Sequence, residues 1–315
     1  MHVVFLGGTH FIGHHAAMAA LAAGHRVTVI HRGSTPSELP FARDVIADRN
    51  DPAEISIAIS KSKPDVVVDT RALTKSDADC VALALGIVRV PLVVLSSADV
   101  YARFGALNGH PAPDDESARG APIGEDAPLT VPYPFQGMEH EGGPLYDKKD
   151  VEHVFHDLTK QQPDIPITIL RLPVVYGSRD PKRRFGSIVD FIDAGGRALP
   201  AQGGARFRLS CIHVTDAAHA IVLACTKAAN GYRVFNIAER QTPAMGERAL
   251  AIANEMGAAV SFEESTTPLD FLGAAPCDCV IDSTRIRSTL GWTEVLTDRE
   301  RLADLVSSLR KSRAA

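Results

Sequence analysis

The sequence predicts an α/β protein built on a doubly wound parallel sheet. Three observations predict this class. Short β-branched segments alternate with Ala/Leu-rich helical segments along the first half of the chain, which is the order of elements that builds a parallel sheet. The β segments are continuously apolar, as expected of strands that helices cover on both faces. A glycine-rich turn joins the first predicted strand to the first predicted helix.

The predicted elements follow in order from the N-terminus. In the first half we expect strands at 3–6, 26–30, 65–69, 92–95 and 167–170, with helices at 12–23 and 76–88. A stretch rich in proline, glycine and acidic residues interrupts this pattern from Tyr101 to Leu145. We expect it to be a functional loop, because long loops in compact domains usually are, unless they are disordered. Beyond Pro173 we expect helices at 186–194, 216–226, 247–256 and 298–309, and a strand at 233–237.

Length and composition narrow the class of protein. The chain has 315 residues, and domains average roughly 150 residues, so about two domains are expected. A net charge of -5 excludes the broad basic surface of a non-specific nucleic-acid binder, although not a local patch. No apolar run approaches the roughly 18 residues that span a bilayer. The five scattered cysteines predict reduced thiols in the cytoplasm, and no metal-binding motif is present.

The first chemical motif is the glycine-rich turn. Residues 3–13 read VVFLGGTHFIG and lead into a helix. Glycines let backbone N–H groups approach a pyrophosphate, and the start of a helix adds a favourable dipole. We therefore expect a dinucleotide site here, with Gly13 allowing close packing of the helix on the strand. The residues expected to contact the cofactor are Gly7, Gly8, Thr9, His10, Phe11, Ile12 and Gly13.

The end of the second strand bears on which dinucleotide binds. An acidic residue there would bond the ribose 2′-hydroxyl of NAD, but the sequence reads His31, Arg32, Gly33. Arg32 offers a cation to the 2′-phosphate of NADP. The sequence therefore predicts NADP as the cofactor, with NAD as the alternative.

Five further motifs follow along the chain. They are Asp48, 96–101 (SSADVY), 171–177 (RLPVVYG), 212–218 (IHVTDAA) and 290–292 (LGW). With the turn, their order and spacing resemble the extended short-chain dehydrogenase/reductase superfamily, and within it the NAD-dependent epimerase/dehydratase family. The resemblance implies a Rossmann-like cofactor domain and a smaller C-terminal substrate lobe. It also implies that Asp48, Arg49, Pro173 and Val174 lie beside the cofactor.

The same resemblance implies how the chain divides. The cofactor domain is expected at 1–172, with returning segments at about 211–238 and 277–290. The substrate lobe is expected at 173–210, 239–276 and 291–315. A homodimer built partly on the helix at 76–88 is implied in the same way.

The catalytic residues that the resemblance implies are a Ser or Thr that orients the substrate oxygen, and a Tyr-x-x-x-Lys pair that moves a proton. Ser97 matches the first position. The second is altered, since residues 144–149 read PLYDKK. No lysine lies four residues after Tyr146, and Pro144 stands four residues before Lys148. Lys148 and Lys149 both stay candidates.

Three interpretations of this altered motif are open. Tyr146 acts from a distorted helix start, where Lys149 would be its neighbour on one helix face. Alternatively, Tyr133 or Tyr101 reaches the site from a loop. In the third interpretation, the site does not perform the usual redox step. The first interpretation predicts that Tyr146→Phe abolishes hydride transfer and leaves cofactor affinity intact.

The positions that hold a diphosphate in nucleotide-sugar enzymes of this family also differ. Val174, Leu209 and Ala275 stand where such members often carry an Asn and two Arg. A diphosphate is typically held by arginines. We therefore expect an NADP-dependent oxidoreductase acting on a small carbonyl or alcohol. The alternatives are a nucleoside-diphosphate-sugar epimerase or dehydratase, and a non-catalytic NADP- or RNA-binding protein. The cations that could replace the missing ones are Arg183, Arg184, Arg206 and Arg208.

Overall fold

The computed structural model of the protein describes residues 1–34, 37–107, 121–131 and 143–314. Its centre is a seven-stranded sheet with strand order β10-β6-β5-β4-β1-β2-β3, and every neighbouring pair is parallel. The strands are β1 (His2–Leu6), β2 (Arg26–His31), β3 (Arg43–Ile46), β4 (Val66–Asp69), β5 (Leu92–Ser97), β6 (Ile167–Leu172) and β10 (Tyr232–Asn236). The predicted doubly wound parallel sheet is confirmed.

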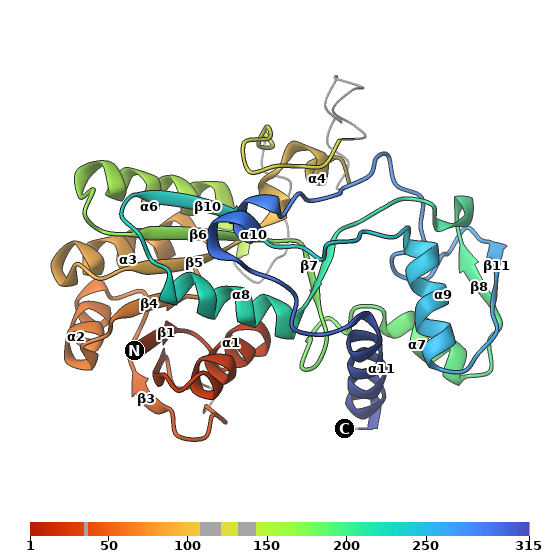
Figure 1. The fold of residues 1–315 in the computed structure, drawn as a ribbon, viewed down its shortest axis with the longest axis horizontal. Coiled ribbons are helices and arrows are strands. Elements are labelled where there is room, and N and C mark those ends of the chain that lie inside the picture. Colours follow the sequence, from red (N-terminus) through yellow and green to blue (C-terminus); the bar gives the residue numbers. More distant parts are fainter. Residues whose placement is uncertain (35–36, 108–120, 132–142, 315) are drawn as a thin grey trace.

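Helices cover both faces of this sheet (Figure 1). On one face lie α1 (Phe11–Ala22) and α8 (Val214–Thr226), which pack against each other; on the other lie α2 (Pro52–Ser62), α3 (Lys75–Val88) and α6 (Lys148–Gln161). Side chains of a strand alternate between the faces. Val3 and Phe5 therefore join the α1–α8 core, whereas Val4 and Leu6 join the core under α2, α3 and α6. Because both faces are covered, the central strand β1 is buried along its whole length and is apolar from Val3 to Leu6.

The smaller C-terminal lobe has its own hydrophobic core, which includes Tyr176, Phe185 and Leu305. Its helices are α7 (Gly186–Asp193), α9 (Met245–Glu255) and α11 (Asp298–Ala314). Two small parallel sheets complete it, pairing β7 (Val174–Tyr176) with β9 (Cys211–His213) and β8 (Ala198–Ala201) with β11 (Ser261–Glu264). The remaining elements are η1 (Ala98–Val100), α4 (Ala102–Leu107), η2 (Gly143–Leu145), η3 (Gly203–Ala205) and α10 (Thr284–Leu290).

The helices that lead toward the site begin at side-chain caps. Asp51 accepts two backbone N–H groups at the start of α2. Thr74 and Asp77 form a capping box at the start of α3, and Asp147 caps α6. Such caps satisfy N–H groups that have no partner inside the helix. The cap at Asp147 fixes the first residue of α6 as Lys148.

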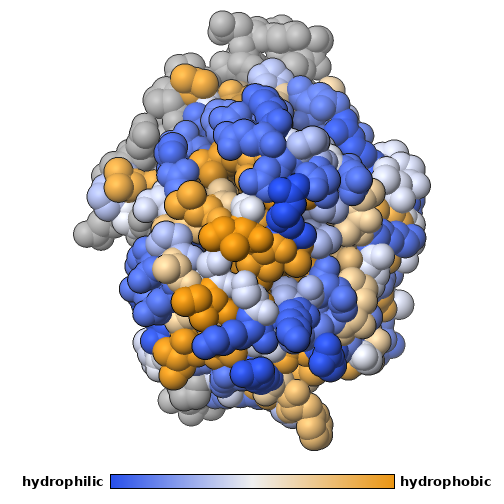
Figure 2. Space-filling view, turned by 90° about the vertical axis from the view of Figure 1, so that its left-hand side faces the viewer, coloured by the Kyte–Doolittle hydropathy of each residue, from blue (hydrophilic) through white to orange (hydrophobic). Residues whose placement is uncertain are grey.

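One end of the molecule exposes apolar side chains. Figure 2 shows them on the side where α2 and α3 lie, and the exposed fractions are 53% for Ile57, 62% for Leu83 and 73% for Ile87. Leu83 and Ile87 belong to the helix on which a homodimer is expected, and that homodimer stays a prediction. No described helix is long and apolar enough to cross a membrane.

Candidate functional site

The glycine-rich turn connects β1 to α1 at the carboxyl end of the sheet. Gly7 and Gly8 have φ of +88° and +99°, values that favour glycine because it has no Cβ. A Cβ on Gly13 would lie 2.6 Å from the Cα of Gly8. Glycine at this position therefore lets α1 rest directly on the turn. His10, in place of the middle glycine of the family pattern, is the exposed N-cap residue of α1.

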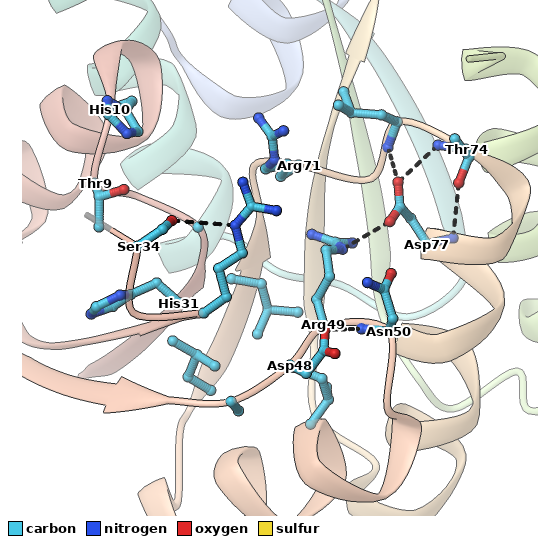
Figure 3. Close-up of a pocket in the computed structure, with 17 residues that line it drawn as sticks. Thr9, His10, His31, Ser34, Asp48, Arg49, Asn50, Arg71, Thr74 and Asp77 are labelled. Carbon is cyan, nitrogen blue, oxygen red and sulfur yellow. Dashed lines mark hydrogen bonds and ion pairs between the residues drawn. The ribbon is translucent and has the colours of Figure 1, made fainter. Parts of the chain in front are cut away.

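A pocket of about 480 Å³ opens at this turn and runs past the ends of β2 and β4 (Figure 3). Its volume lies in the range of small-molecule sites. The candidate cofactor residues that line it are Gly7, Thr9, His10, Arg32, Asp48 and Arg49. The other candidates, which do not line it, are Gly8, Phe11, Ile12, Gly13, Pro173 and Val174. The turn and the ends of two strands thus form one site that suits the adenosine half of a dinucleotide.

Arg49 is held within the wall of this pocket. Its Nη1 and Nη2 donate to the two carboxylate oxygens of buried Asp69 at 3.2 and 3.0 Å, and its Nε lies 3.1 Å from Asp77. Asp77 also caps α3. The ion pairs join the segment after β3 to β4 and α3, so Arg49 shapes the pocket and its charge is already neutralised.

Arg32 and Asp48 are the exposed charges at the rim of the pocket. Arg32 follows β2, and its Nε lies 3.3 Å from the hydroxyl of Ser34. Asp48 is held in place because its carboxylate accepts the N–H of Asn50 and its own N–H donates to Glu54. Arg32 therefore presents a cation at the position where the ribose 2′-substituent is expected.

Ser97 forms a hydrogen-bonded pair with Asp99. Ser97 is the last residue of β5; its Oγ donates to Oδ2 of Asp99 at 2.8 Å and accepts the N–H of Asp99 at 3.2 Å. Burial raises the pKa of Asp99, against the lowering effects of Ser97, Lys182 and Arg184. Asp99 was missed by the sequence analysis. The signal that could have identified it is a carboxylate two residues after the candidate serine.

Lys148 is the first residue of α6 and is only 5% exposed. Its Nζ donates to the carbonyl oxygens of Ala72 at 2.7 Å and Leu95 at 2.9 Å, which follow β4 and lie in β5. Burial lowers the pKa of Lys148 to about 8. An ammonium group has three N–H donors. The two hydrogen bonds use two of them, so the third N–H of Lys148 is available at the carboxyl end of the sheet.

Lys148→Met is expected to change how stability depends on pH. The pKa of Lys148 is about 8 in the folded protein and about 10.4 in an unfolded chain. Between these values the unfolded chain binds more protons, so the wild type gains stability as pH rises. Relative to the variant, its free energy of unfolding should increase by up to about 3 kcal/mol between about pH 7 and about pH 11. Urea unfolding of both proteins measures this, and parallel pH profiles would contradict it.

Tyr146 precedes α6 and does not lie on it. It pairs with Thr74 in an antiparallel bridge, and its buried side chain belongs to the hydrophobic core of the C-terminal lobe. Lys149 extends to Thr130, with its Nζ 2.7 Å from the carbonyl oxygen. The expectation that Tyr146 and Lys149 are neighbours on a helix face is wrong, because Asp147 caps the helix after the tyrosine.

The loop tyrosines do not take the place of Tyr146 among the described residues. Tyr101 is fully buried; its hydroxyl donates to Asn236 at 2.7 Å and accepts from Arg171 at 2.9 Å. Burial raises the pKa of Tyr101 to about 12. Arg171 in turn forms an ion pair of 2.6 Å with Glu152 on α6. Tyr101 is thus part of a buried network under the site, and Tyr133 lies outside the described residues.

Three of the four arginines considered for diphosphate binding are bonded within their own lobe. These bonds join Arg183 to Asp190, Arg184 to Asp180, and Arg208 to the carbonyl oxygen of Thr242. Arg206 is exposed. The part of the chain that the structure describes contains no group of three His, Cys, Asp or Glu side chains that could hold a metal ion.

Comparisons with known proteins identify the family to which this chain belongs. The family model for the NAD dependent epimerase/dehydratase family matches residues 3–90 and 145–238. The chain therefore belongs to the NAD-dependent epimerase/dehydratase family, as its motifs predict. No curated protein matches the chain significantly.

Several solved structures share the fold over the whole chain. A UDP-glucose 4-epimerase from Stenotrophomonas maltophila, with NAD and formylated UDP-arabinopyranose, is 20% identical, covers 100% of both chains and has a TM-score of 0.77. A dTDP-glucose 4,6-dehydratase from Bacillus anthracis, with NAD, is 17% identical over 100% of this chain and 98% of its own, with a TM-score of 0.74. A UDP-glucose 4-epimerase from Bifidobacterium longum, with NAD+ and UDP, is 17% identical over 99% of both chains, with a TM-score of 0.72. At these identities the likeness establishes the fold.

Proposed function

We propose that this chain is a dinucleotide-dependent epimerase or dehydratase in which Ser97 and Asp99 move the proton. The observation that carries the proposal is the 2.8 Å hydrogen bond from Ser97 to Asp99 at the carboxyl end of β5. When bound, the cofactor would supply hydride chemistry for a substrate carbon that bears oxygen. The glycine-rich turn and the pocket beside it fit such a group, because they offer backbone N–H groups, a helix N-terminus and a cation.

The proton route follows from the direction of the observed hydrogen bond. The Ser97 hydroxyl donates a hydrogen bond to the carboxylate of Asp99, so its oxygen can still accept a hydrogen bond from a substrate hydroxyl. As that hydroxyl becomes a carbonyl, its proton passes to Ser97 while the proton of Ser97 passes to Asp99. When the carbonyl becomes a hydroxyl again, Asp99 returns the proton to Ser97, and Ser97 gives its own proton to the substrate oxygen. A carboxyl whose pKa burial raises is suited to this work, because acid–base catalysis is most effective when the pKa approaches the working pH.

Lys148 serves as the positioning cation of this site. Two of its N–H groups hold the ends of β4 and β5 together. We assign the third to the ribose hydroxyls of the cofactor. This role needs no tyrosine four residues before the lysine, so the proline at Pro144 does not prevent it.

The substrate class that we propose is a nucleoside-diphosphate sugar. The solved structures with this fold include epimerases of UDP-glucose and a dehydratase of dTDP-glucose. They support the epimerase or dehydratase alternative over the small-carbonyl oxidoreductase that the sequence favours. The oxidoreductase stays the second candidate, because three of the arginines that would bind a diphosphate are bonded to other groups.

A substrate panel separates the two candidates. The protein is incubated with UDP- and dTDP-hexoses, and the products are identified by NMR. An epimerase or dehydratase yields an isomerised or dehydrated sugar with no net change in nicotinamide absorbance, and cofactor copurifies with the protein. Stoichiometric consumption of NADPH with a small carbonyl compound, and no change in any nucleotide sugar, would favour the oxidoreductase.

Arg32→Ala tests the proposal that the cofactor is NADP. Arg32 stands exposed at the rim of the pocket, and a hydrogen bond to a charged group is worth about 1.5–3 kcal/mol. The variant should bind NADP about 10- to 100-fold more weakly and NAD unchanged. Calorimetric titration with both cofactors measures this. Arg26→Ala, which removes an exposed arginine that does not line the pocket, is the control. Tighter NAD binding by the wild type, with NADP unaffected by the variant, would refute the preference.

A further inference from the structure

Arg71 lies beside the glycine-rich turn, although it is distant from it in sequence. It is the second residue after β4, and β4 neighbours β1 in the sheet. A Cβ built on Gly7 would lie 3.6 Å from the Cβ of Arg71 and 2.4 Å from the hydroxyl of Thr70. The turn after β4 therefore contacts the glycine-rich turn with no side chain between them. Arg71 lines the same pocket as Gly7 and Arg32 (Figure 3).

The backbone around Arg71 is fixed from both sides. Its N–H donates to Oδ1 of Asp69 at 2.9 Å, and Asp69 is itself held by Arg49. The hydroxyl and the N–H of Thr70 both donate to the carbonyl of Leu6, at 3.0 and 3.1 Å. The Cα of Arg71 is thus anchored relative to β1 and to the turn that follows it.

The arginines that line the described part of the pocket lie at different places along it. The arginines among its described lining residues are Arg32, Arg49 and Arg71. Asp69 and Asp77 neutralise Arg49, and Arg32 lies at the end of β2. A pyrophosphate at the turn carries two negative charges, whereas a helix N-terminus offers only about half a positive charge. The first four residues of α1 contain one histidine, His14, and no lysine or arginine.

We propose that Arg71 binds the pyrophosphate of the cofactor. The guanidinium group suits this because its planar fork can donate two parallel hydrogen bonds to phosphate oxygens. The proposal rests on the dinucleotide site of the proposed function and adds a residue to it. NAD and NADP share the pyrophosphate and differ at the 2′-position. Loss of Arg71 should therefore change the affinities for both cofactors, whereas loss of Arg32 should change the affinity for NADP alone.

The test compares the affinities of both cofactors for Arg71→Ala and Arg32→Ala by calorimetry, with Arg26→Ala as the control. Arg71→Ala should weaken NAD and NADP by the same factor, about 10-fold or more, whereas Arg32→Ala should weaken NADP alone. Arg71→Lys keeps a charge but loses the fork, so it should weaken both cofactors equally and by a smaller factor. It serves as the test if the alanine variant does not fold.

Two outcomes would overturn the assignment. If Arg71→Ala weakens NADP and not NAD, the side chain belongs to the 2′-phosphate. If it weakens neither, the side chain does not contact the cofactor. These results are distinguishable from failure of the dinucleotide site on which the proposal rests, since in that case the wild type itself binds neither cofactor.

Discussion

Replacing Asp99 with asparagine is expected to lower kcat by about 10²- to 10⁴-fold and to leave cofactor affinity unchanged. Asparagine has the same shape, and its oxygen can still accept the hydrogen bond that Ser97 donates at 2.8 Å. It cannot take up the proton, so the route from the substrate hydroxyl ends at Ser97. Single-turnover hydride transfer measures the chemical step, and calorimetry with the cofactor shows whether the pocket is intact.

The pH profile of this reaction gives a second readout. The carboxylate form of Asp99 accepts the proton, so kcat should fall as the pH falls through the pKa of Asp99, which burial raises above its usual value. This acid limb should be absent in the residual activity of Asp99→Asn. An acid limb that is identical in the two proteins would assign it to another group.

Tyr146→Phe is the matched control for the Asp99 variant. Tyr146 lies before α6 in the core of the C-terminal lobe, so we expect a small effect on the hydride-transfer rate. The unmodified family motif would instead require a large one. Loss of hydride transfer in Tyr146→Phe together with normal turnover in Asp99→Asn would show that the tyrosine moves the proton.

The second large effect is expected from Gly13→Ala. The new Cβ would lie 2.6 Å from the Cα and 2.9 Å from the nitrogen of Gly8. Both are backbone atoms, so α1 or the turn has to move away, and overpacking of this kind costs about 1–3 kcal/mol. Cofactor affinity should therefore fall by about 10- to 100-fold, because the backbone N–H groups of the displaced turn would no longer be aligned to donate to the pyrophosphate.

Gly124→Ala is the control for this substitution. Apart from its chain neighbours, no atom of the described residues lies within 4 Å of a Cβ at Gly124, and its φ is not in the left-handed region. It should bind cofactor and unfold thermally as the wild type does. Wild-type affinity in Gly13→Ala would mean that the turn can relax without loss of its geometry.

Much of the fold could be predicted because buried parallel strands leave a simple mark in the sequence. β1, β4 and β5 are runs of β-branched and other apolar residues, and α1 and α3 are rich in alanine and leucine. β3 leaves no such mark. It lies at the edge of the sheet, is four residues long, and has exposed or half-buried side chains.

The part of the site that is formed by the glycine-rich turn and the ends of strands could be predicted from the sequence. The part that depends on single side chains in other turns could not. The glycine-rich turn, Arg32 and Asp48 line one pocket, because the carboxyl ends of neighbouring parallel strands meet at one edge. Arg71 and Asp99 belong to turns in which no periodicity marks a functional residue. Tyr146 was expected at the start of a helix, on the same face as Lys149. This expectation was wrong because Asp147 is the N-cap of α6, so the helix begins after the tyrosine.

The hydrogen bond from Tyr101 to Asn236 joins residues that are 135 positions apart. Tyr101 follows directly on the segment that holds Ser97 and Asp99, whereas Asn236 ends β10, the strand that completes the sheet last in chain order. During synthesis, a ribosome must release most of the polypeptide before this partner is present. The edge that carries the proposed site is therefore finished late in biogenesis, and a nascent chain that stops before β10 has the glycine-rich turn without a completed site.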